Sequence, residues 1–107
     1  MADHDAMMAR FVHDYLELLD HRVSSIRSHL EQRNFMTAHV ALLSLESTSV
    51  MVGAAGLAEA AGHLREAVEQ GERDAVPALL TVVDAEADRT RHELTDEPAG
   101  SESDQPA

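Results

Sequence analysis

The stretch from Asn34 to Leu57 is long enough for one helix, and its apolar residues fall on two separate faces. One set recurs at alternate steps of three and four residues, which is the spacing of a helix face that packs in a bundle. This core stripe consists of Phe35, Ala38, Leu42, Leu45, Ser49 and Val52. A helix with such a stripe has to bury it against other helices.

A second, mostly apolar set lies about 150° away from the core stripe on a helix of 3.6 residues per turn. This outer stripe consists of Met36, Val40, Leu43, Ser47 and Val50. Because a single-layer bundle buries only one face of each helix, we expect the outer stripe to face solvent. His39 and Glu46 lie on the rim between the two stripes. An apolar face with a few polar neighbours is typical of a binding surface, so we predict that these seven residues contact a partner.

The rest of the chain predicts an all-α fold. Apolar residues follow the same three-and-four spacing from Leu16 to Leu30, and further helical faces run from Leu57 to Val68 and from Val76 to Leu94. Strands are not expected, because no segment alternates strictly between apolar and polar residues. Short links between the helices predict an up-down four-helix bundle.

The predicted helix ends follow from a few residues. We expect a tight connection at 31–34, with Asn34 as the N-cap of the central helix, and we expect Gly53 and Gly71 to end their helices. Before the bundle we expect a separate short N-terminal helix. The position of its end, near Asp20 or Ser24, stays open because no Pro or Gly marks a break.

The length of 107 residues predicts one domain, which we place at residues 1–94. The remaining segment, TDEPAGSESDQPA, is rich in Pro, Gly, Ser and acidic residues and cannot bury a core. We therefore expect residues 95–107 to form a disordered acidic tail.

Composition excludes several classes of partner. The formal net charge of −12 and the lack of Lys and Arg clusters argue against binding nucleic acid or an anionic membrane. The absence of cysteine excludes disulfides and thiolate metal sites. The sequence shows neither a signal peptide nor an apolar run of about 20 residues, so we expect a cytoplasmic protein.

The sequence predicts no metal site, no cofactor and no enzymatic activity. His13, His21 and His29 are spaced by eight residues, which turns each about 80° from the last on a helix, so they do not converge. Phosphate-binding loops, nucleophile elbows and zinc-protease motifs are missing from the sequence.

The segments FVHDYLELLDHRVSSIRSHLEQRNF, LSLESTSVMVGAAGL and HLREAVEQGERDAVPALL together resemble the histidine-containing phosphotransfer (HPt) family. These four-helix domains pass a phosphoryl group to and from the receiver domains of response regulators. Their exposed signature helix reads approximately H-x-L-K-G-S/A-x-x-x-L/V-G-A-x-x-L. Here Leu45, Val52, Gly53, Ala54 and Leu57 match its structural positions. The resemblance covers residues 11–94 and implies a role in two-component signalling.

The positions that carry the family's chemistry differ. In this register Leu43 replaces the phosphoacceptor histidine, Glu46 replaces the lysine and Ser47 replaces the glycine that follows it. Leucine has no nucleophilic atom and cannot accept a phosphoryl group. The resemblance therefore implies a protein that binds a receiver domain or a histidine-kinase-related partner without itself carrying phosphate.

Two alternatives stay open. His39 lies one turn before Leu43 and could act as a displaced phosphoacceptor, although a register built on His39 fits the signature poorly. The outer stripe could instead join two copies of the chain in a homodimer.

Overall fold

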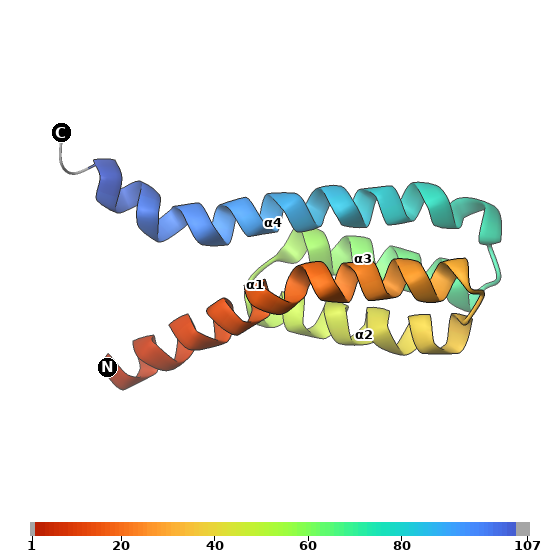
Figure 1. Cartoon of the computed structure of the whole chain (residues 1–107), viewed down its shortest axis with the longest axis horizontal. Coiled ribbons are helices and arrows are strands. Elements are labelled where there is room, and N and C mark those ends of the chain that lie inside the picture. The colour runs from red at the N-terminus through yellow and green to blue at the C-terminus, as the bar shows by residue number, and fades with distance from the viewer. Residues whose placement is uncertain (1, 105–107) are drawn as a thin grey trace.

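The protein is described here by a computed structural model that covers residues 2–104, with side chains from Ala6 to Thr95. Its elements are α1 (Ala2–Glu31), α2 (Phe35–Met51), α3 (Ala55–Glu69), the 3-10 segment η1 (Arg73–Ala75) and α4 (Val76–Asp104). Successive helices run in opposite directions, and α4 returns to pack beside α1 (Figure 1). The described residues contain no strand, and the predicted all-α, up-down four-helix bundle is confirmed.

The first helix differs from our expectation. A separate short N-terminal helix was predicted, but α1 is continuous from Ala2 to Glu31. No Pro or Gly interrupts this stretch, and Tyr15, Leu19 and Val23 continue one buried face through the expected break. Asp20 lies inside the helix, where its carboxylate pairs with Arg91 of α4.

The N-terminal part of α1 and the C-terminal part of α4 extend beyond the ends of α2 and α3 (Figure 1). Among the described side chains of α4, Leu94 is the last that packs against the core. Beyond it the α4 backbone is helical to Asp104, within the segment for which we predicted a disordered tail. Residues 105–107 lie outside the described part of the chain.

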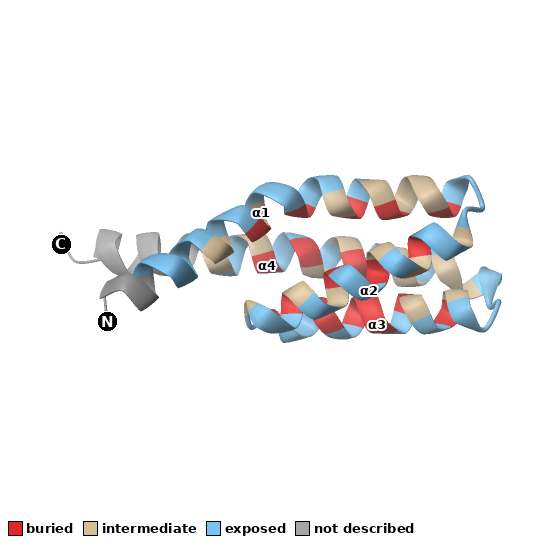
Figure 2. Ribbon diagram, turned by 90° about the horizontal axis from the view of Figure 1, so that it is seen from below, coloured by how far each residue is buried: buried red, intermediate tan, exposed pale blue. Residues whose placement is uncertain are grey.

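The core lies along the centre of the bundle, where the buried residues of all four helices face one another (Figure 2). Its largest fully buried side chains are Leu19, Ile26, Leu42, Leu45, Leu57, Leu64 and Val83. The predicted core stripe of α2 is confirmed: Ala38, Leu42, Leu45 and Ser49 are buried, and Phe35 and Val52 pack partly against them. Ser49 is polar, but its hydroxyl forms a 2.8 Å hydrogen bond with the hydroxyl of Tyr15.

The three connections between helices share one geometry. Each has a single residue with positive φ: Arg33 at 61°, Gly53 at 81° and Gly71 at 71°. The N–H of that residue donates to the carbonyl three residues earlier, and the next N–H donates to the carbonyl five residues before it. This is the Schellman closure of a helix C-terminus, and it confirms that Gly53 and Gly71 end their helices.

Other contacts join α1 to α4 and close one end of the bundle. Arg27 pairs with Asp84, and the Arg73 guanidinium lies 4.7 Å from the centre of the Phe35 ring. Asn34 precedes α2 as expected, but its side-chain oxygen accepts from the Thr37 hydroxyl instead of a backbone N–H. Within the described residues, no helix has both the length and the apolar character needed to cross a lipid bilayer.

Candidate docking surface on α2

The outer stripe of α2 is exposed along its whole length, as predicted. Met36 is 81% exposed, and Leu43, near the middle of the helix, is 46% exposed. Val40, Ser47 and Val50 are exposed as well. Exposed large apolar residues are common singly, but here they recur on one helix face, which is typical of an interaction surface.

On the α3 side, four polar residues form a chain of contacts that borders the outer stripe. His39 Nε2 lies 2.7 Å from Glu69 Oε2, and Arg65 Nη1 donates to the same carboxylate oxygen at 3.3 Å. Arg65 Nε also donates to Glu46 Oε1 at 2.8 Å. The four side chains therefore connect α2 to α3 at two points, about two turns apart on α2.

The charged groups in this chain of contacts stabilise one another. The hydrogen bond from His39 is the main cause that lowers the pKa of Glu69, and the charge of Arg65 acts in the same direction. The hydrogen bond to Glu46 in turn raises the pKa of Arg65. Glu46 is therefore a paired anion, and the outer stripe does not have an isolated negative charge beside it.

Gly62 of α3 makes room for Glu46. A Cβ atom at this position would lie 2.9 Å from Glu46 Oε2, closer than side-chain atoms normally approach. The close approach at Gly62 is therefore to this carboxylate. The pairing of Glu46 with Arg65 was missed, because residues 19 positions apart on different helices carry no periodic signal.

On the α1 side, Arg22 reaches across to α2. Its Nη1 donates a 3.1 Å hydrogen bond to Ser44 Oγ. Ser44 follows Leu43 directly and is one turn from both Val40 and Ser47, so this contact lies at the edge of the outer stripe. Sequence reasoning also missed Arg22, since it had treated α1 only as a source of core residues.

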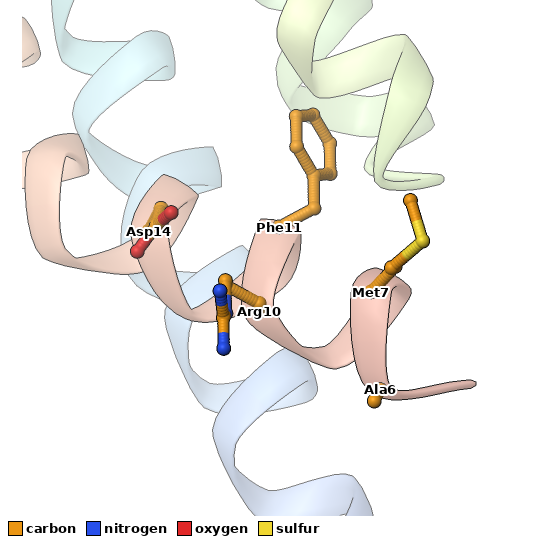
Figure 3. A pocket seen from close by; sticks show the side chains of 5 residues that line it. All are labelled: Ala6, Met7, Arg10, Phe11 and Asp14. Atoms are coloured by element: carbon orange, nitrogen blue, oxygen red, sulfur yellow. The ribbon is translucent and has the colours of Figure 1, made fainter. Parts of the chain in front are cut away.

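An apolar hollow lies at the C-terminal end of α2. It is lined by Met7, Met8, Phe11 and Met51, and Met51 directly follows the outer stripe residue Val50. Met7 and Phe11 project to the same side of α1 (Figure 3). Together with Ala6, Arg10 and Asp14 they also line a second hollow. Met7 and Met8 are both exposed.

The histidines predicted not to converge are not grouped by the structure. Instead, one exposed turn of α1 brings ligand atoms of His13, Asp14 and Glu17 within 4.8 Å of one another, with His13 Nε2 3.3 Å from Glu17 Oε2. Their close spacing on one helix could have revealed this group. Exposed side chains of this kind often lie together without an ion, and we assign them no metal.

Comparison of the chain with protein-family models, curated proteins and solved structures finds no match. The chemistry available to the surface therefore has to be read from its own residues. Leu43 has no nucleophilic atom, and the Nε2 atom of His39 already forms a hydrogen bond with Glu69. These residues provide an apolar contact area with a polar flank on each side. On the α3 flank the charged side chains are paired with one another, and on the α1 flank lies the guanidinium of Arg22.

Proposed function

We propose that the protein is an HPt-like adaptor of a cytoplasmic two-component system. Its outer stripe binds a receiver domain or a histidine-kinase-related partner, and the protein does not carry phosphate itself. The observation that supports this proposal is Leu43, an exposed leucine in the middle of the outer stripe, at the position where the HPt resemblance places a phosphorylated histidine. An exposed leucine favours burial against a partner over group transfer.

The pairing of His39 weighs against the alternative of an active relay. Its side chain is 30% exposed, and Nε2 is bonded to Glu69, so an incoming phosphoryl group at that atom would have to displace a carboxylate. Glu69 would also repel the phosphoryl group. The adaptor function therefore agrees better with the environment of His39 than a displaced phosphoacceptor does.

A homodimer is the second candidate, and one observation favours it. The outer stripe residues 36, 40, 43, 47 and 50 follow steps of four and three, which is the spacing of a helix that pairs with another helix. Sedimentation at two concentrations separates the two functions. A monomer whose mass does not change with concentration would exclude the dimer.

The test of the adaptor uses purified receiver domains from response regulators of the same genome, charged with radiolabelled phosphate. We expect wild-type protein to bind a receiver without taking up label. Leu43→Glu places a charge in the proposed contact and should weaken binding by at least about tenfold, since burying an unpaired charge costs more than 1.4 kcal/mol.

Val82→Glu is the matched control. Val82 of α4 is 46% exposed, the same as Leu43, and the described backbone of α4 does not approach that of α2. Equal loss of binding in both variants would contradict a docking site on α2. Label that passes to the wild type but not to His39→Gln would show an active relay instead.

A further inference from the structure

The residues one turn from the contact of Arg22 with Ser44 include no carboxylate. From the contact of Arg22 with Ser44, one turn in each direction leads along α1 to Leu18 and Ser25 and along α2 to Ala41 and Thr48. None of these residues is acidic, although the chain has 20 Asp and Glu residues in 107. The positive charge of Arg22 therefore has no carboxylate one turn away on either helix.

Arg22 differs in this respect from the three arginines that form ion pairs between helices. Arg27 pairs with Asp84, Arg65 with Glu46 and Glu69, and Arg91 with Asp20 and Asp88. Among the side chains from Ala6 to Thr95, Arg22 has only the neutral Ser44 as a hydrogen-bond partner and no carboxylate oxygen within 4.0 Å. Its guanidinium is held in place by a hydroxyl that leaves its charge available.

We propose that Arg22, oriented by Ser44, selects a partner whose surface presents a carboxylate beside an apolar side chain. The apolar side chain would lie on the outer stripe near Leu43, and the carboxylate would accept from Arg22. This inference rests on the proposed function, because it assumes that the outer stripe is the docking surface, and it adds the chemistry that such a partner must have.

The two flanks of the outer stripe explain why the carboxylate belongs at Arg22. On the α3 flank, Arg65 is already paired with Glu46 and Glu69, so a partner gains little from a charge there. On the α1 flank, docking would remove water from Arg22 and leave a cation unpaired unless the partner supplies an anion. A partner with a basic or purely apolar surface at this point is penalised, which is how charged residues provide specificity.

The first experiment compares Arg22→Glu with Arg89→Glu in binding to the receiver domain used for Leu43→Glu. Both variants change the net charge equally, and Arg89 lies on α4, away from α2. We expect Arg22→Glu to raise Kd by about tenfold or more relative to Arg89→Glu, and Arg22→Lys to recover part of the loss. Equal Kd values for the two Glu variants, with Leu43→Glu still defective, would overturn the role of Arg22 and leave the docking surface standing.

The second experiment does not depend on a receiver. Amide NMR spectra of the protein are recorded with millimolar 4-phenylbutyrate and, separately, with 4-phenylbutylamine. We expect the carboxylate probe to shift the amides of Arg22, Leu43 and Ser44, the amine probe not to, and Arg22→Glu to abolish the shifts. Shifts with the carboxylate probe but no receiver binding would refute the proposed function and support the chemistry of this site. Equal shifts with both probes, or none with the carboxylate, would refute the inference itself.

Discussion

Ser49 and Tyr15 form a buried polar pair between α2 and α1. Ser49 is fully buried and Tyr15 is 5% exposed, and their hydroxyls lie 2.8 Å apart. Burial raises the pKa of the Tyr15 phenol, and the hydrogen bond from Ser49 opposes that shift. Since neither hydroxyl can reach bulk water, each depends on the other for its hydrogen bond. The pair therefore fixes the register of α2 against α1.

A double-mutant cycle tests this pair. Tyr15→Phe and Ser49→Ala should each lower the free energy of unfolding by about 1–2 kcal/mol, because each leaves one buried hydroxyl without its partner. The double variant should lose less than the sum of the two, since it removes both polar groups. Urea unfolding measures all four proteins. Strictly additive losses would mean that the two hydroxyls do not stabilise each other in the folded protein.

Arg33 occupies a backbone conformation that suits glycine. Its φ of 61° equals that of a left-handed residue, and the corresponding positions of the other two connections are Gly53 and Gly71. A side chain in this conformation costs about 1–2 kcal/mol relative to glycine. Arg33→Gly should therefore raise the unfolding free energy by about 0.5–1 kcal/mol after the greater freedom of glycine in the unfolded chain is subtracted.

Arg33→Ala is the control for the Arg33→Gly prediction, because it removes the guanidinium and keeps the Cβ atom. It should not stabilise the protein. If thermal unfolding shows the same gain for both variants, the guanidinium and not the backbone conformation is the source of the strain.

At the scale of elements, α2 and α3 are joined by the chain of His39, Glu69, Arg65 and Glu46. Because the folded-state pKa of Glu69 is lowered, its contribution to stability is present above the ordinary carboxyl pKa. That contribution is lost as the pH falls through the lower, folded-state pKa. The contact between α2 and α3 should therefore weaken at acidic pH.

The pKa of Glu69, followed by NMR of its side-chain carboxyl carbon, tests this account. His39→Ala removes the largest cause of the shift and should raise the pKa of Glu69 toward its ordinary value, with Arg65 holding back part of the change. His63→Ala, at an exposed position of α3, is the matched control and should leave it unchanged. An unaltered pKa of Glu69 in His39→Ala would contradict the hydrogen bond.

The sequence predicts the features that depend on local residue patterns, and it misses those that depend on contacts between helices. Core positions such as Leu42 and Leu45 follow from helical periodicity. The turns at Gly53 and Gly71 can be predicted because glycine favours this backbone conformation. Arg33 forms the same turn without such a signal, because its conformation is imposed by the packing of α1 and α2. Arg22 and Arg65 lie on helices other than α2, and only the assembled bundle brings them to the edges of the outer stripe.

The prediction of a separate N-terminal helix was wrong for a related reason. The local sequence around Asp20 offers a possible cap, but a cap is used only where the chain leaves the helix. Here the buried face continues from Tyr15 to Leu30, so packing against the other helices favours one continuous α1. Tertiary contacts decided a point that the local sequence left open.

At the scale of the whole molecule, the described methionines all lie on the surface. Met7, Met8, Met36 and Met51 are exposed, and the core is built from Leu, Ile, Val, Ala and Tyr. Mild peroxide should therefore convert these methionines to sulfoxides without reducing helicity, measured by circular dichroism, while binding of the receiver falls. Mass spectrometry counts the oxidised residues.

The control for oxidation is the double variant Met36→Leu and Met51→Leu. Since leucine is not oxidised to a sulfoxide, this protein should keep more of its binding after peroxide treatment than the wild type does. Loss of helicity in step with oxidation would instead mean that the methionines support the fold.

The three identical helix closures also determine how the molecule can respond when a partner arrives. Each one bonds the last turn of a helix to the residue that precedes the next element, so backbone hydrogen bonds restrain α2 at both of its ends. The outer stripe is therefore presented in its final position before contact. The heat capacity change of association should then reflect only the surface removed from water at the interface, with no contribution from folding.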